Sequence, residues 1–412
     1  MTPGADLSPD LPEELALARL RQVHADSADS VKRTPILTAG SFSARLGAPV
    51  ALKAENLQRT GSFKLRGALA KVRASGAVAG VVAGSAGNHA QSLAYAARRF
   101  GLPCEVFMPV DASVGKMAAV RAFGAEVHAE GESVDECVEL AKARAAEAGL
   151  LFVHPFDDLD VIAGQAGVGI EILEDLPEAG TLVVPIGGGG LISGVAAAAR
   201  QLRSDLRIVG VQAERCASFP EAVAGSREVT APSVTTIADG IAVKRPGEVT
   251  LPLVEALVDQ VVTVSESAIA EAMAILLERS KLVVEGAGAA SLAAAISAQV
   301  ELDPERPNVL VLSGGNVDIG LLAKIAARQD TLQGRRLRLS TKVSDRPGGM
   351  ASLLATVAAA QANLITVEHV RESPDLDVRE TGVQLTLETR GQDHADEVRA
   401  ELRRAGYDAV DA

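Results

Sequence analysis

The sequence predicts an α/β fold with two parallel-sheet layers, followed by a small ferredoxin-like α+β domain. From residue 49 onward, short apolar runs alternate with helical patterns, which indicates parallel strands covered by helices. Hydrophobic residues make up 48% of the chain but aromatic residues only 2%, so the core must consist mainly of Ala, Val, Leu and Ile, as in parallel sheets under small-residue helices. Beyond residue 336 the pattern changes to strand, helix, strand, strand, helix and strand, which is typical of a ferredoxin-like domain.

The α/β part begins with the run PVALKA (49–54), which predicts a strand and is followed by a helix over 62–74. The run VVAG (81–84) predicts the next strand, followed by a helix over 88–101. The number of such units favours two sheet layers over one. We expect further strands at 104–109, 125–130, 181–186, 207–213 and 308–313, and a helix over 191–204.

The C-terminal part follows a polar, turn-prone segment at 326–336, which is typical of a linker. Its predicted strands alternate apolar and polar residues, as expected for a sheet with one buried face. The expected elements are strand 336–344, turn 345–349, helix 350–362, strand 364–372, strand 382–390, helix 394–406 and a short strand at 407–410.

Charge and composition exclude several classes of partner. The net charge of −13 would repel a polyanion, so we expect no nucleic-acid partner. The first fifteen residues lack the basic and then apolar pattern of a signal peptide, and no apolar run approaches the ~20 residues that span a bilayer. We therefore expect a cytoplasmic protein without membrane contact. Cys104, Cys137 and Cys216 are far apart and lack metal-ligand spacing, which predicts reduced core thiols.

A run of four glycines, Gly187–Gly190, follows the strand predicted at 181–186 and precedes an Ala-rich helix. Glycines let the backbone approach a ligand and turn its N–H groups inward, and a helix N-terminus favours an anion. The loop has neither the G-x-x-x-x-G-K-[ST] pattern of a nucleoside-triphosphate loop nor the G-x-G-x-x-G order of a dinucleotide fold. A phosphate cradle is therefore a better interpretation than a merely flexible turn.

Lys64 lies in the first turn of the helix predicted over 62–74, where Ser62 is expected to cap the N-terminus. On its own such a lysine is usually a solvated helix residue. A helix N-terminus and partial burial both lower the pKa of a lysine, and a neutral amine can form a Schiff base. A Schiff-base lysine combined with a phosphate cradle is the pairing that pyridoxal 5′-phosphate requires.

Two more small-residue turns follow predicted strands. The turn at 85–91 offers N–H groups for a carboxylate and an amide, Asn88, for a phenolic oxygen of a cofactor. In the turn at 313–316, the hydroxyl of Ser313 could meet a ring nitrogen, which it cannot protonate as an aspartate would. Taken alone, each turn is as well explained by ordinary helix capping, and an isolated His89 is more often a structural histidine.

The segments GSFKLRGA, SAGNHAQ, PIGGGGL and SGGN, in this order, resemble the threonine ammonia-lyases of the tryptophan-synthase-β-like, fold-type II pyridoxal-phosphate enzymes over residues 15–325. The resemblance implies that Lys64 is the Schiff-base lysine and catalytic base. It also implies contacts from Phe63 and Asn88 to the cofactor ring and its 3′-oxygen, and from Ser313 to the ring nitrogen. It places Gly187, Gly188, Gly189, Gly190 and Leu191 at the phosphate, Ser85, Gly87, Asn88 and His89 at the substrate carboxylate, and Gly240 and Glu285 at further pocket positions.

The same resemblance implies a large catalytic domain from 1–52 and 155–328 and a small one from 53–154. Residues 336–412 resemble an ACT domain, a module that binds amino-acid effectors at subunit interfaces, so we expect an allosteric homodimer or homotetramer. Related serine racemases have a serine base where this chain has Ala86, so racemisation should be poor. They also bind a divalent metal, for which Glu214 is present here but Pro220 replaces an aspartate; no metal is assigned, and Glu214 stays a candidate ligand of a monovalent cation.

These features predict an enzyme that converts L-threonine to 2-oxobutanoate and ammonia, and L-serine to pyruvate. Two alternatives share the fold: a serine dehydratase or racemase, and a β-replacement synthase. An alternative of another class is a non-catalytic amino-acid sensor, against which the presence of Lys64 argues. A nucleotide-binding dehydrogenase ranks low because the glycine loop lacks the dinucleotide order.

Overall fold

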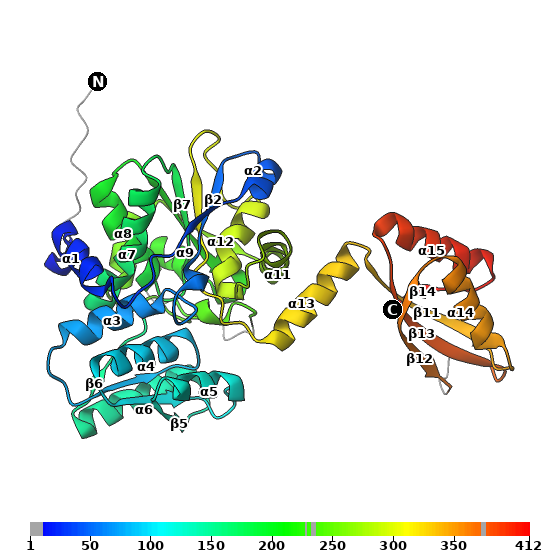
Figure 1. The fold of residues 1–412 in the computed structure, drawn as a ribbon, viewed down its shortest axis with the longest axis horizontal. Helices are drawn as coiled ribbons and strands as arrows, with labels where there is room; N and C mark the ends of the chain where they lie inside the picture. Colours follow the sequence, from blue (N-terminus) through cyan, green and yellow to red (C-terminus); the bar gives the residue numbers. More distant parts are fainter. Residues whose placement is uncertain (1–10, 227–228, 232–235, 372–375) are drawn as a thin grey trace. The chain divides into compact units, whose positions relative to one another are not determined.

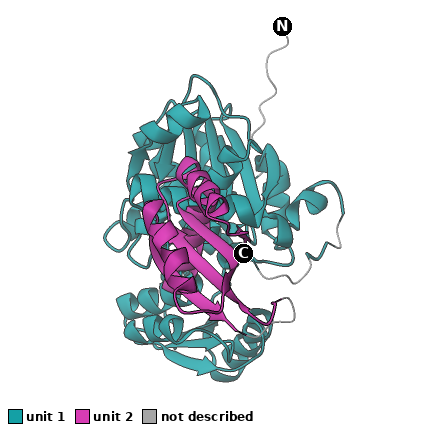
Figure 2. Cartoon of the chain, turned by 90° about the vertical axis from the view of Figure 1, so that its right-hand side faces the viewer, with its two compact units in different colours: residues 1–317 teal, residues 318–412 magenta. Residues whose placement is uncertain are grey.

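The structure, a computed structural model, describes residues 11–226, 229–231, 236–371 and 376–412. It divides the chain into two compact units, residues 1–317 and 318–412 (Figures 1 and 2). Residues 1–10, part of the segment in which we expect no signal peptide, and residue 372, the end of the strand predicted at 364–372, lie outside the described residues.

A six-stranded sheet forms the centre of the first unit, with strand order β1-β2-β10-β7-β8-β9; Figure 1 labels β2 and β7. All neighbours are parallel except β1, which runs antiparallel to β2. The parallel sheet that was predicted from residue 49 onward is confirmed, and β1 is a strand that was not predicted. The strands are β1 (Ile36–Thr38), β2 (Val50–Lys53), β7 (Thr181–Pro185), β8 (Arg207–Ala213), β9 (Gln260–Val264) and β10 (Asn308–Val311).

A second, four-stranded sheet has the order β5-β4-β3-β6 and is parallel throughout. The chain therefore leaves the large sheet after β2, builds the small sheet, and returns to the large sheet at β7. Both crossings lie beside the candidate site described below. The strands are β3 (Val81–Gly84), β4 (Cys104–Met108), β5 (Glu126–Ala129) and β6 (Leu151–Phe152).

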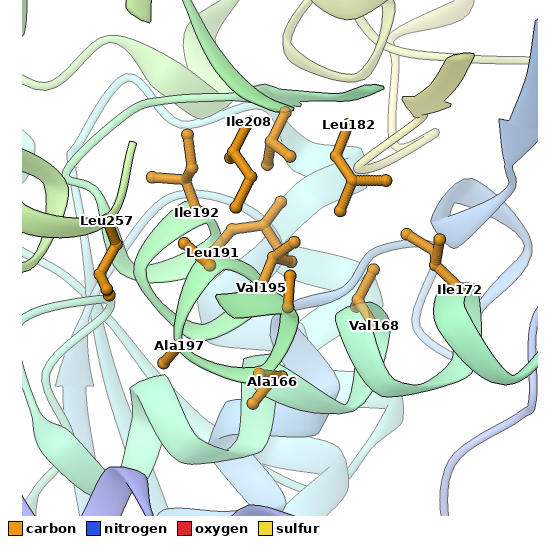
Figure 3. Packing of buried hydrophobic residues seen from close by; sticks show 14 of the residues in the cluster. Ala166, Val168, Ile172, Leu182, Leu191, Ile192, Val195, Ala197, Ile208 and Leu257 are labelled. Carbon is orange, nitrogen blue, oxygen red and sulfur yellow. The ribbon is translucent and has the colours of Figure 1, made fainter. Parts of the chain in front are cut away.

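Helices of small residues cover the large sheet. A Cβ atom on Gly169 of α7 would lie 2.8 Å from the carbonyl oxygen of Val195 in α8, so glycine lets the two backbones approach closely. Side chains of α7, α8, β7 and β8 gather in one buried cluster that includes Leu182, Leu191 and Ile208 (Figure 3). The helices of this unit are α1 (Leu17–Ser27), α2 (Gly40–Leu46), α3 (Lys64–Ala74), α4 (Asn88–Phe100), α5 (Val114–Ala122), α6 (Val134–Ala148), α7 (Leu159–Asp175), α8 (Gly190–Leu202), α9 (Phe219–Val223), α10 (Thr250–Leu257), α11 (Glu266–Ile275) and α12 (Gly286–Ile296).

Four buried charges join α3 to the large sheet, and we call them the charge quartet: Lys53, Glu55, Arg66 and Glu171. Arg66 donates two hydrogen bonds to each glutamate, at 2.7 to 2.9 Å, and Lys53 Nζ lies 2.6 Å from Glu171. All four side chains are at most 2% exposed. Two positive and two negative charges cancel, so the network can remain ionised in the core. It fixes the helix that begins at Lys64.

The second unit begins with the helix α13 and continues with an antiparallel sheet of order β12-β13-β11-β14 and two further helices, in the predicted βαββαβ order. Inward residues of β11 and β13, such as Leu339 and Leu385, form its core with Val357 and Val398 from the helices. Residues 318–328, which we assigned to the catalytic domain, are grouped with this unit because α13 packs against β11. Its elements are α13 (Ile319–Leu332), β11 (Arg336–Ser344), α14 (Gly349–Ala359), β12 (Asn363–Val370), β13 (Glu380–Glu388), α15 (Gln392–Arg404) and β14 (Val410–Asp411).

The three cysteines lie in the interior of the fold. Cys104, Cys137 and Cys216 are buried, as predicted for core thiols. Burial raises the pKa of Cys104 to about 12 and that of Cys137 to about 11, so both thiols stay protonated. Within the described ranges, no helix is both long and apolar enough to cross a membrane.

Candidate active site

Lys64 is placed by a pairing between two distant loops. Ser62 forms an isolated antiparallel bridge with Gly314. The backbone N–H of Phe63 donates to the carbonyl of Ser313 at 3.1 Å, and that of Gly315 donates to Gly61 at 2.8 Å. Ser62 therefore does not cap α3 as predicted, because its backbone is held in this bridge and α3 begins at Lys64 without a side-chain cap. The segment before the lysine is locked to the end of the large sheet.

The amine of Lys64 is held in a largely dry environment. Its Nζ donates to the carbonyl of Pro155 at 2.6 Å and lies 5.3 Å from the centre of the Phe63 ring. Loss of hydration lowers the pKa of Lys64 to about 8, although the carboxylate of Glu285 opposes this shift. A substantial fraction of the amine is therefore neutral near pH 8, as a nucleophilic or basic lysine requires.

The glycine loop turns into α8 with no room for side chains. A Cβ atom on Gly188 would overlap the ring of Phe156, and one on Gly190 would lie 2.8 Å from the carbonyl oxygen of Phe156. Gly189 is the N-cap of α8 and has a φ of +95°, which favours glycine. Leu191 points into the core, as Figure 3 shows. The first N–H groups of α8 have no partner within the helix and can bind an anion.

The return crossing between the sheets brings the lysine and the glycine loop together. Pro155 accepts the hydrogen bond from Lys64, and the next residue, Phe156, packs against Gly188 and Gly190. The amine of Lys64 and the glycine loop therefore contact neighbouring residues of one dipeptide, Pro155–Phe156. The structure thus unites the two features that predicted the cofactor from the sequence.

Asn88 connects three loops on another side of the site. Its Nδ2 donates to Glu285 at 2.7 Å, and its Oδ1 accepts from Asn316 at 2.7 Å. A Cβ atom on Gly240 would lie 3.4 Å from the Glu285 carboxylate, and one on Gly314 would overlap it. Loss of hydration, and then the nearby carboxylate of Asp239, raise the pKa of Glu285 to about 7. The predicted pocket positions Gly240 and Glu285 therefore lie beside Asn88.

The turn at 85–89 presents backbone groups rather than side chains. The hydroxyl of Ser85 accepts from the N–H of Gly87 at 3.3 Å, and α4 begins at Asn88. No atom would lie within 4 Å of a Cβ on Gly87, so the space beside it is open. The side chain of His89 is buried, and its Nε2 lies 2.8 Å from the carbonyl oxygen of Val153. Burial, and then Lys64, lower the pKa of His89 to about 3, so the neutral ring is structural and only its backbone N–H can face a ligand.

Glu214 is the predicted candidate that remains apart from these contacts. It is exposed at the end of β8. The part of the chain that the structure describes holds no group of three or more His, Cys, Asp or Glu residues able to bind a metal.

Sequence reasoning missed Pro155, Phe156 and Thr250, which shape the site without reactive groups. Pro155 and Phe156 follow β6, a strand of only two residues, so the turn after it lacked the apolar run that marked the others. Thr250 donates to the carbonyl of Gly188 at 2.6 Å from 62 residues away. The turn at 154–158 could have been found from the sequence, because HPFDD resembles the other polar segments that follow strands. No feature of the sequence near Thr250 indicated its contact with the glycine loop.

The reactivity of Lys64 can be tested without a cofactor. We expect Lys64 to react with an amine-acylating reagent with a midpoint near pH 8, because its pKa is lowered, whereas an ordinary solvated lysine has a pKa of about 10.4. Mass spectrometry of peptides from pulse-labelled apoprotein measures the midpoint. A lysine model peptide is the control, and a Lys64 midpoint above about 10 would contradict the dry environment described here.

The residues present fit pyridoxal 5′-phosphate. Lys64 supplies an amine of which a substantial fraction is neutral near pH 8. The loop from Gly188 to Gly190 packs so closely against Phe156 and Thr250 that only glycine fits, and it leads into the helix N-terminus of α8, whose first N–H groups can bind an anion. The loop pairing places Ser313 beside Phe63, and Asn88 contacts Glu285, the N-cap residue of α12. A single charged cofactor that carries an aldehyde and a phosphate matches both ends of this site.

Comparison with known proteins agrees with this geometry. A family model for pyridoxal-phosphate dependent enzymes matches residues 28–314. An L-threonine ammonia-lyase of Geobacter sulfurreducens is 44% identical over 380 residues, which cover 92% of this chain and 94% of that protein. The processed form of threonine deaminase isoform 2 from Solanum lycopersicum has a TM-score of 0.69 and 33% identity over 75% of this chain and 88% of that chain. Maize serine racemase has a TM-score of 0.71 and 34% identity over 77% of this chain and 98% of that chain. The chain therefore belongs to the pyridoxal-phosphate dependent enzymes.

Proposed function

We propose that this enzyme eliminates water from L-threonine, so that 2-oxobutanoate and ammonia are the final products, and that it converts L-serine to pyruvate in the same way. The observation that carries the proposal is the amine of Lys64, with a pKa of about 8, beside the glycine loop. The 44% identity to an L-threonine ammonia-lyase over nearly the whole chain supports the choice of substrate.

Pyridoxal phosphate, when bound, supplies an aldehyde for the substrate amine and a ring that accepts electrons when the Cα–H bond breaks. The chain supplies the base. Lys64 can take the Cα proton in its neutral form, which its lowered pKa makes abundant near pH 8, and the carbonyl of Pro155 fixes the direction of Nζ. The turn at 85–89 binds the substrate carboxylate through unpaired N–H groups at the start of α4. The aldehyde and phosphate ends of the cofactor are held by Lys64 and the glycine loop.

The direct test is product analysis with a panel of amino acids. We expect 2-oxobutanoate from L-threonine and pyruvate from L-serine, with one ammonia per keto acid. Adding a thiol nucleophile should not divert the product into a thioether. Thioether as the main product would favour the β-replacement alternative, and no turnover of any amino acid would favour the non-catalytic sensor.

Ala86 distinguishes elimination from racemisation. Because the methyl group of Ala86 cannot transfer a proton, we expect the enzyme to form pyruvate from L-serine with little D-serine. We expect Ala86→Ser to increase the ratio of D-serine to pyruvate at least about tenfold, which corresponds to ~1.4 kcal/mol in the difference between the two activation barriers. Chiral chromatography of the reaction mixture measures this ratio. Ala86→Val adds bulk without a hydroxyl and should leave the ratio unchanged. Rapid D-serine formation by the unmodified enzyme would refute the argument.

We infer further that residues 336–412 form an ACT-like regulatory domain that binds an amino-acid effector. The βαββαβ order, the antiparallel sheet and the stretch DRPGGMASLLATVAAAQANL support this inference. Isoleucine, valine and serine are the effectors to test. A shift of the threonine saturation curve by one of them is expected, and saturation curves that none of them alters would contradict a regulatory role.

A further inference from the structure

Thr250 controls the backbone of the glycine loop. Its buried hydroxyl donates to the carbonyl of Gly188 at 2.6 Å and accepts from the N–H of Gly247 at 3.1 Å. Because the peptide bond is planar and trans, fixing the carbonyl of Gly188 also fixes the direction of the N–H of Gly189. A Cβ on Gly189 would lie 2.7 Å from the Cβ of Thr250, so the two residues are also in close contact. Thr250 therefore sets the orientation of a donor in the anion-binding loop.

Asp157 in turn fixes Thr250. Its carboxylate accepts hydrogen bonds from the N–H groups of Glu248, Val249 and Thr250, at 2.9, 2.9 and 3.1 Å. These are the N–H groups at the start of α10, which have no partner within the helix, and a negative charge there also meets the positive end of the helix dipole. A Cβ on Gly247 would overlap Asp157, so the contact is tight.

Asp157 follows Phe156, and this closes a circuit of contacts. Phe156 packs against Gly188, Gly188 is bonded to Thr250, and Thr250 is bonded to Asp157. The neutral ring of His154 accepts from the N–H groups of Phe156 and Asp157, at 3.3 and 2.7 Å, and so stiffens the turn. The turn also carries the carbonyl that orients Lys64. The glycine loop and the lysine thus share one support.

We propose that Asp157 and Thr250 are positioning residues for the phosphate of the cofactor, which act through the glycine loop and set the affinity of the enzyme for pyridoxal phosphate. This inference rests on the proposed function only in that the chain must bind the cofactor. A purely structural role in capping α10 would predict a loss of stability without a selective loss of phosphate recognition.

The test compares Thr250→Val with Thr250→Ser in full-length apoprotein. We expect Thr250→Val to weaken pyridoxal phosphate binding at least about tenfold, the cost of one lost hydrogen bond and a misdirected donor. Thr250→Ser keeps the hydroxyl and should bind within about threefold of the parent. Pyridoxal, which lacks the phosphate, should bind to both variants with an affinity within about threefold of its affinity for the parent. Absorbance titration measures each affinity, so the readout does not depend on turnover.

Controls separate this role from folding. Thr381→Val removes a buried hydroxyl that donates to a backbone carbonyl in the second unit and should leave cofactor affinity unchanged. Asp157→Asn keeps the shape but loses the charge and should weaken pyridoxal phosphate binding by an amount smaller than Asp157→Ala. Equal losses for pyridoxal and pyridoxal phosphate, or unchanged phosphate selectivity in all variants, would overturn the proposal. A parent chain that binds neither compound would instead refute the proposed function.

Discussion

Replacing Lys64 with alanine is expected to lower kcat for threonine deamination at least about 10⁴-fold, which corresponds to ~5 kcal/mol of lost transition-state stabilisation. The variant loses the amine that we propose as the Schiff-base lysine and as the base for the Cα proton. A neighbouring histidine, His89, is neutral and bonded to a backbone carbonyl. Steady-state release of 2-oxobutanoate measures the loss.

Two controls show that the loss is chemical. Lys142→Ala removes an exposed lysine of α6 that forms an ion pair with Glu139 on its own helix, and its turnover should equal that of the parent. Borohydride reduction of the parent should attach the cofactor to Lys64, as peptide mass spectrometry detects, and should attach none in Lys64→Ala. Normal dehydratase rates in Lys64→Ala, or reduction of the cofactor onto another side chain, would contradict the role proposed for Lys64.

Replacing Glu171 with glutamine is expected to destabilise the first unit by about 3 to 5 kcal/mol. The substitution leaves Lys53 and Arg66 as two buried positive charges against Glu55 alone, because Glu171 is fully buried between them. An uncompensated charge in the core costs far more than the lost hydrogen bonds. Urea unfolding of the full chain at neutral pH should show a large decrease in the urea concentration at which the first unit is half unfolded.

The matched control is Glu271→Gln, which removes one partner of an exposed ion pair with Arg45 and should change the stability by no more than about 1 kcal/mol. A second variant tests the cause. Adding Lys53→Met to Glu171→Gln restores neutrality, since Arg66 then faces Glu55, and the double variant should be more stable than Glu171→Gln alone. A double variant less stable than the single one would show that charge balance is not what the quartet provides.

The strands that the sequence marks most clearly are those that are buried on both faces. β3, β7 and β10 have no exposed position, so each appears as an uninterrupted apolar run. β1 and β6 were missed because they are only three and two residues long and half-buried. β9 was missed although QVVTV is rich in β-branched residues, because its polar ends resemble a loop.

The candidate site was predictable where a residue type is chemically required. The lysine in the first turn of a helix and the run of glycines after a strand can be recognised in the sequence alone, without knowledge of their neighbours in the fold. The role of Ser62 was not predictable, because its pairing with Gly314 spans most of the catalytic unit. The charge quartet was likewise hidden, since Lys53, Glu55 and Arg66 look like surface residues until α7 supplies Glu171. Long-range contacts decide these positions, and a single sequence does not record them.

The order of strands in the large sheet has a consequence for biosynthesis. β10 lies between β2 and β7, yet it is the last strand of this sheet to leave the ribosome. Until residue 311 is made, β2 and β7 have no common neighbour, and each presents unpaired backbone groups that favour aggregation. Closing such distant pairs is slow. A chain truncated before β10 should therefore need chaperone protection, whereas loss of the second unit should not prevent this sheet from closing.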